Sequence, residues 1–137
     1  MGKIVVRIRL TNRNDEVLNL AKARKAEPRH AEVEALVDTG ATRLYLQTGV
    51  IKTLGLQRLG TVKSQTANGE CLRGKYGTVH LELMGRGENF DLVEVPDSVS
   101  NLLGQVPLEM LDFVINPKTQ ELTPNPAHGG EQMTEEY

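Results

Sequence analysis

One stretch of the chain combines residue types that catalysis uses, the tripeptide Asp38-Thr39-Gly40. It follows a short apolar and β-branched run, Val33 to Val37, which is typical of a β-strand. The next three residues supply a carboxylate, a hydroxyl and a glycine, which are typical of a turn rather than a strand. A strand that ends in an acid and a glycine-containing loop fixes a carboxylate on a rigid scaffold. We therefore interpret Asp38 as a candidate catalytic carboxylate, while a plain surface turn of the same composition stays open as the alternative.

The neighbourhood of the tripeptide distinguishes it from an ordinary turn. Ala41 follows it directly, and an apolar-apolar-glycine sequence, Leu102-Leu103-Gly104, occurs later in the chain. Together these features resemble the retropepsin-like aspartic proteases, and most closely the small single-domain members found in bacteria and archaea. The resemblance extends from Lys3 to Pro126. It implies an aspartic endopeptidase that acts on a peptide or protein substrate and needs no metal or other cofactor.

The chemistry of this family needs two aspartates, which activate a water between them and share one proton, because two like charges so close together cannot both ionise. The chain contains a single Asp-Thr-Gly, so the resemblance implies a homodimer in which each subunit contributes Asp38. It also implies that Thr39 bonds across the dimer axis and that Gly40 lets water approach the carboxylate. Ala41 is expected to border the substrate backbone, and Leu102–Gly104 to pack beneath the catalytic loop.

A β-hairpin is predicted where Asn68-Gly69 separates two extended runs. By the resemblance, this hairpin is the flap that closes over a bound peptide, and Ala67, Asn68 and Gly69 at its tip contact substrate. A surface turn would have the same sequence. The resemblance also implies that Val99, in the loop after Pro96, lines the substrate cleft.

Two positions depart from the family pattern. Gln47 stands where related bacterial sequences usually carry proline, and Gln105 stands where retroviral proteases carry an arginine. The first affects only the local turn. The missing arginine, and a hairpin tip poorer in glycine than the retroviral flap, leave a second hypothesis open, in which the same fold is a catalytically weak or inactive module for dimerisation or peptide binding. A phosphatase or ATPase is set aside, because neither its aspartate motifs nor its helix content fits this sequence.

Short extended segments separated by turn residues make up most of the chain. The run Ile4–Leu10 alternates apolar residues with Arg7 and Arg9, and residues 79–83 alternate in the same way. Such segments predict a mainly β fold, namely a closed retropepsin-like (acid protease) β-barrel with two or three short helices.

The first two helices have recognisable ends. Asn12 or Asn14 is expected to cap the first helix, and Thr48 to cap a second helix at 49–54 that Gly55 ends. The apolar residues of the first helix fall on one side: they are Val17, Leu18, Leu20 and Ala21.

Length and composition indicate a single domain. The chain has 137 residues and a net charge of −2, which gives no reason to expect nucleic acid or a membrane as a partner. We expect one domain at 1–123 and a flexible polar tail at 124–137. No apolar stretch resembles a signal peptide, and the single Cys71 cannot form an intrachain disulfide, so a cytoplasmic location is expected. The histidines and Cys71 show no spacing typical of metal ligands.

Overall fold

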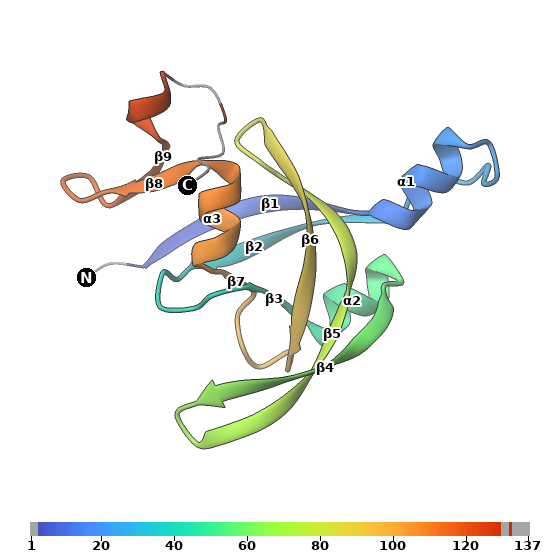
Figure 1. Cartoon of the computed structure of the whole chain (residues 1–137), viewed down its shortest axis with the longest axis horizontal. Helices are drawn as coiled ribbons and strands as arrows, with labels where there is room; N and C mark the ends of the chain where they lie inside the picture. The colour runs from blue at the N-terminus through green and yellow to red at the C-terminus, as the bar shows by residue number, and fades with distance from the viewer. Residues whose placement is uncertain (1–2, 130–131, 133–137) are drawn as a thin grey trace, which may run out of the picture.

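Strands make up most of the protein in the computed structural model, which describes residues 3–129 and 132 (Figure 1). In chain order the elements of the described residues are β1 (Ile4–Asn12), α1 (Arg13–Leu20), β2 (His30–Val37), β3 (Leu44–Gln47), α2 (Thr48–Leu54), β4 (Gln57–Thr66), β5 (Gly69–Leu83), β6 (Arg86–Val95), β7 (Leu102–Leu103), α3 (Gln105–Leu111), β8 (Phe113–Asn116), β9 (Glu121–Pro124) and the 3₁₀ turn η1 (Pro126–His128). No helix among these residues is long and apolar enough to cross a membrane.

The main sheet runs round in a ring. Its strand order is β1-β2-β7-β3-β6-β5-β4, and β1 also pairs with β5. The ring is thin at β7, whose two residues pair with β2 on one side and with β3 on the other. The mainly β fold with short helices is therefore confirmed, but the sheet is ringed rather than closed, and the closed barrel stays a prediction.

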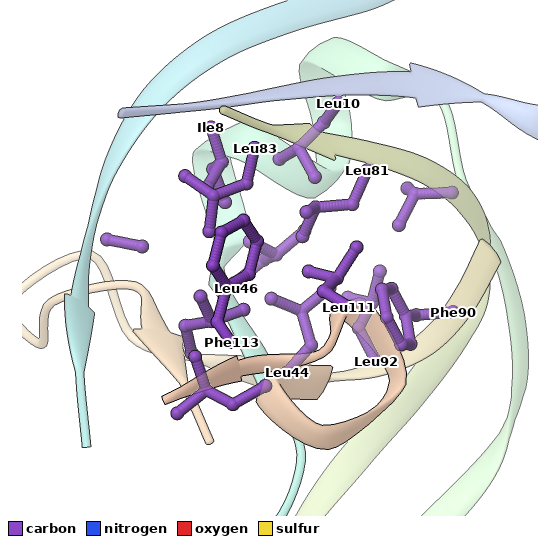
Figure 2. Close-up of a cluster of buried hydrophobic side chains, with 14 of the residues drawn as sticks. Ile8, Leu10, Leu44, Leu46, Leu81, Leu83, Phe90, Leu92, Leu111 and Phe113 are labelled. Atoms are coloured by element: carbon purple, nitrogen blue, oxygen red, sulfur yellow. The ribbon is translucent and has the colours of Figure 1, made fainter. Parts of the chain in front are cut away.

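The core fills the inside of this ring (Figure 2). Alternate residues of the strands point into it, as the sequence pattern predicts. In β5, Val79, Leu81 and Leu83 are buried, while His80 and Glu82 point away from the core. Helix α3 adds Leu108 and Leu111, and burial of each such side chain stabilises the fold by about 1.5–3 kcal/mol.

Helix α1 is capped as predicted but does not pack by its apolar side. The Asn12 side chain accepts a hydrogen bond of 3.0 Å from the Asp15 amide. The apolar residues of the helix stay exposed, and Leu20 is 77% exposed. The reason is that α1 projects from the ring at the end of β1 (Figure 1) and is held there by the buried carboxylate of Asp15. The ion pair between Asp15 and Arg29, with 2.8 Å between Oδ2 and Nε, therefore docks this helix in place of an apolar stripe.

The predicted cap of α2 is wrong. Thr48 is the first residue of the helix, and its hydroxyl donates to Glu94 at 2.9 Å instead of capping. The amide of Gly49 is bonded by the carboxylate of Asp97, also at 2.9 Å. A residue distant in sequence thus caps the helix from the loop after β6. Gly55 ends the helix with a left-handed φ of 61°, as expected.

The last strands form a separate two-stranded sheet, β8–β9. It extends to Pro124, and the turn η1 follows within the segment expected to be a flexible tail. There the side chain of His128 bonds to Asp112, and the Asn125 amide donates to the Asp112 carbonyl at 2.9 Å. Residues 130–131 and 133–137 of the predicted tail lie outside the described residues.

Candidate active site

The Asp38 loop begins where β2 ends. The last residue of β2, Val37, pairs with Leu103 of β7. The Asp38 amide donates to the Leu103 carbonyl at 3.0 Å, and the Ala41 amide closes the turn onto the Asp38 carbonyl at 3.1 Å. The backbone of the aspartate is therefore fixed by the sheet on one side and by its own turn on the other.

Gly40 lies against the carboxylate. Its amide donates to Asp38 Oδ1 at 2.9 Å. A Cβ atom at Gly40 would stand 3.2 Å from that same oxygen, which is tighter than an ordinary contact. Any larger residue would therefore press on the carboxylate. Glycine is needed here for close approach, rather than for a left-handed backbone conformation.

Leu102-Leu103-Gly104 packs beneath this loop, as the resemblance implied. A Cβ atom at Gly104 would come within 2.4 Å of the Arg43 carbonyl oxygen. The Gly104 amide instead donates to that oxygen at 3.0 Å, and the next two amides donate to the carbonyls of Ala41 and Thr42 at 2.8 and 2.9 Å. The amides at the start of a helix lack partners within it. Here the carbonyls of the Asp38 loop accept hydrogen bonds from the first amides of α3.

A cleft of about 780 Å³ opens above the loop. One wall is the loop itself, and another is the arm of the β4–β5 hairpin that ends at Thr66. Of the predicted site residues, four line this cleft: Asp38, Gly40, Ala41 and Val99. The other four do not line it: Thr39, Ala67, Asn68 and Gly69. The last three form the tip of the predicted hairpin, where Thr66 pairs with Gly69.

A family model described as aspartyl protease matches residues 25–106 of the chain. The match includes the Asp38 loop, the hairpin and Leu102–Gly104. The chain belongs to this family, which is part of the retropepsin-like clan. No curated protein matches the chain. Membership supports a function of the aspartic protease type. Because the match begins at Lys25, helix α1 lies outside it.

Asp38 is the only acid among the described residues that line the cleft. The other aspartates of the strand and loop regions have different partners. Asp91 accepts from the Thr78 hydroxyl at 2.8 Å, Asp97 caps α2, and Asp112 bonds to His128. None of these lines the cleft, so within the described part of the chain no second carboxylate accompanies Asp38 there. Within that part, no cluster of acidic, histidine and cysteine side chains is suited to a metal ion.

Two polar residues hold the cleft loop that contains Val99 in place. The Gln47 side chain donates to the Val99 carbonyl at 2.8 Å, and the Gln47 amide donates to Asn101 Oδ1 at 2.8 Å. Asn101 is buried and donates in turn to the Glu34 carbonyl at 3.0 Å. Sequence reasoning treated Gln47 only as a departure from the family pattern and missed Asn101, because a polar residue beside Ser100 gives no sign of burial.

Sequence reasoning also missed residues that the sheet brings to the cleft. Tyr45 pairs with both Val93 and Leu102, and these three residues form part of the cleft floor. Arg43 lies just before β3, and Arg73 lies on β5, where it pairs with Val62. Their strands are far apart in sequence, so no local pattern indicates that they share one cavity.

Proposed function

We propose that the protein is an aspartic endopeptidase that hydrolyses peptide bonds between the two Asp38 residues of a homodimer. The observation that carries this proposal is the Asp38 loop itself. Its carboxylate lines a cleft and has one oxygen bound by the Gly40 amide, while the backbone of the loop is held by hydrogen bonds to Leu103 and Gly104. A catalytic carboxylate needs this combination of fixed position and open access.

The proposed reaction requires a homodimer because it needs two acids, and the described residues that line the cleft include one. Thr39 and Gly40 are exposed in the single subunit, so they are available for contact with a second copy of the loop. In the dimer, the ionised Asp38 takes a proton from water as the water oxygen attacks the scissile carbonyl carbon. The protonated Asp38 donates a hydrogen bond to the carbonyl oxygen.

The tetrahedral intermediate then collapses. A proton passes from the aspartate pair to the amide nitrogen, the carbon–nitrogen bond breaks, and a free amine and a carboxylic acid leave. The pair retains one proton and can start again. The cleft admits a peptide between the Asp38 loop and the β4–β5 hairpin, and closure of the hairpin would exclude water from the site. We propose a cytoplasmic location, with no nucleic acid or membrane as partner.

The test is cleavage of a mixed peptide library at mildly acid and neutral pH. Wild type, Asp38→Asn, and wild type with a statine-type transition-state analogue are compared. We expect cleavage by wild type alone, with a loss of at least about 10²-fold in Asp38→Asn, as for removal of a general acid or base. Asp91→Asn is the matched control, because Asp91 lies outside the cleft and asparagine still accepts the bond from Thr78.

Sedimentation measures the dimer in the same samples. A wild-type protein that is monomeric at assay concentration would contradict the proposal, and so would full cleavage by Asp38→Asn. A dimer that binds peptides without cleaving them would favour the alternative function, a peptide-binding module. One observation favours this alternative: the tip of the hairpin at Ala67 and Asn68 does not line the cleft.

A further inference from the structure

The cleft carries more positive than negative charge. Three cationic side chains line it, from Arg43, Lys63 and Arg73, against the single carboxylate of Asp38. Among the described residues, none of these three cations makes a side-chain hydrogen bond or an ion pair. Arginines elsewhere behave differently: ion pairs hold six of them, and the side chain of Arg58 donates to the Thr61 hydroxyl at 3.2 Å. Among the described residues, the two arginines with neither kind of side-chain partner therefore both line the cleft.

The two arginines reach the cleft from separate walls. Arg43 belongs to the loop that carries Asp38, two residues before Tyr45 of the floor. Arg73 pairs directly with Val62 across the β4–β5 hairpin. Residues that pair directly across strands share one face of a sheet, and Val62 lines the cleft. Arg73 is thus on the inner face of the hairpin, and a peptide between the two walls passes both cations.

The floor between these cations is apolar, and none of its residues named below is charged. It consists mainly of Tyr45, Val93, Val95, Val99 and Leu102. An arginine beside an apolar surface binds a carboxylate more strongly than it does in open water, because water screens the charges less. Its planar guanidinium also matches a carboxylate with two parallel hydrogen bonds. The cleft is therefore suited to a chain with apolar and acidic side chains.

We propose that the cleft selects peptides with aspartate or glutamate on either side of the scissile bond, and that Arg43 and Arg73 bind these carboxylates. This inference rests on the proposed function, because it assigns a substrate class to that site. In a homodimer the two-fold axis repeats both arginines, so acidic residues are favoured on both sides of the bond. The residues nearest the cleaved bond remain apolar or neutral, because Asp38 repels a carboxylate there.

The experiment uses pairs of peptides that differ only in glutamate or glutamine at flanking positions. The glutamate peptide is expected to have a kcat/KM at least about tenfold higher at low salt, the size typical of charge-assisted hydrogen bonds. The double variant Arg43→Met/Arg73→Met is expected to lose this preference and still cleave the glutamine peptide. Arg43→Lys/Arg73→Lys, which keeps both charges, is expected to retain part of it.

Lys118→Met is the matched control, because Lys118 is an exposed cation in the turn between β8 and β9, outside the cleft. It should keep the full preference for glutamate. Raising the salt concentration should reduce the preference in wild type and leave cleavage of the glutamine peptide unchanged. Equal rates for both peptides in wild type, or an unchanged preference in the double methionine variant, would overturn the inference.

Binding separates this inference from the proposed function. Fluorescence anisotropy of the same labelled peptides is measured on wild type and on Asp38→Asn, where no cleavage is required. Preferential binding of the glutamate peptide without any cleavage by wild type would support the inference and contradict the protease. Cleavage with no preference in rate or binding would support the protease and contradict the inference. If neither peptide binds and neither is cleaved, the inference is wrong.

Discussion

Two aspartates of this chain show opposite ways of using a carboxylate. Asp15 on helix α1 is buried, and Arg29 donates to its two oxygens from the backbone amide and the guanidinium at 2.8–3.0 Å. Asp38 accepts one bond from the neighbouring Gly40 amide, and it lines the cleft. The first carboxylate is occupied by structural partners, while the second is fixed through its backbone and open to a reactant.

The difference teaches how to separate a structural acid from a catalytic one. An aspartate that holds elements together has its oxygens bound by cations, so it stays ionised and cannot exchange a proton with substrate. A catalytic aspartate must be positioned without being neutralised. For Asp38, the proposed catalytic residue, the main-chain bonds of the loop to Leu103–Val106 provide that position, and they leave the carboxylate available.

The largest effect should come from Asp38→Asn. We expect a loss of peptide cleavage of at least about 10²-fold, because an amide cannot take a proton from water. The midpoint of thermal unfolding should stay within about 2–4 °C of wild type, since the loop is held by backbone bonds and surface changes shift stability little. Calorimetry and the cleavage assay measure the two quantities on one preparation. A large drop in the midpoint would show that Asp38 is also a structural residue.

Gly104→Ala tests the support beneath the Asp38 loop. The added Cβ atom would meet the Arg43 and Ala41 carbonyl oxygens at 2.4 and 2.7 Å, and both are backbone atoms that are hard to displace. We expect the free energy of unfolding to fall by about 1–3 kcal/mol or more, as for overpacking in a dense interior. Urea unfolding measures it. Gly60→Ala is the control, because nothing lies within 4 Å of a Cβ atom there.

The parts of the fold that follow local patterns could be predicted from the sequence. Alternation in Ile4–Leu10 predicted which face of β1 is buried, and Asn68-Gly69 predicted the hairpin between β4 and β5. The spacing of Asp38-Thr39-Gly40 and Leu102-Leu103-Gly104 led to the correct family. In each case the information lies within a few neighbouring residues, or in a motif that the family shares.

Contacts between distant segments could not be predicted. Asp97 caps α2 in place of Thr48, and Asn101 links β2 to β3, yet both look like ordinary loop residues in sequence. The positive charge of the cleft was also missed. Arg43 and Arg73 line the same cleft only because β3, β6 and β5 pair with one another. Strand pairing decides these features, and a single sequence without relatives does not reveal it.

Asp15→Asn should have the opposite effect to Asp38→Asn: it should lower the stability and leave cleavage unchanged. Asparagine at position 15 loses the negative charge that Arg29 and Arg24 surround. We expect stability to fall by about 1.5–3 kcal/mol, the usual size of a hydrogen bond to a charged group. Cleavage per folded molecule should stay unchanged, because Asp15 lies outside the cleft. Urea unfolding and the cleavage assay test the two halves, and a selective loss of activity would contradict the structural role.

The contribution of Asp15 should also depend on pH. Hydrogen bonds from the Arg29 side chain lower the pKa of Asp15 from 3.8 to about 2, against the opposing effect of burial. Since the pKa of the folded state is the lower one, the stabilisation is complete above pH 4 and is lost as the pH falls toward 2. It should amount to about 1–2 kcal/mol, because the Arg29 side chain is partly exposed and water screens the pair.

Unfolding of wild type and Asp15→Asn is therefore compared at pH 7, 4 and 2.5. The difference in stability between them should shrink at the lowest pH, because the Asp15 carboxylate of wild type is then becoming protonated and losing its negative charge. A difference that stays the same at all three values would mean that packing or hydrogen-bond geometry, rather than charge, accounts for the effect of the substitution.

The smallest effect expected concerns Val99 on the floor of the cleft. Gln47→Ala removes the side-chain bond to the Val99 carbonyl, which holds a residue of the cleft in place. A neutral hydrogen bond contributes about 0.5–1.5 kcal/mol, so we expect KM to rise by about two- to tenfold while kcat stays near wild type. Gln105→Ala is the control, because its side chain bonds only to Glu109 on α3, outside the cleft. If kcat fell instead of KM rising, Gln47 would act on the reacting atoms through the Asp38 loop, and the proposed separation between a catalytic loop and a binding floor would not hold.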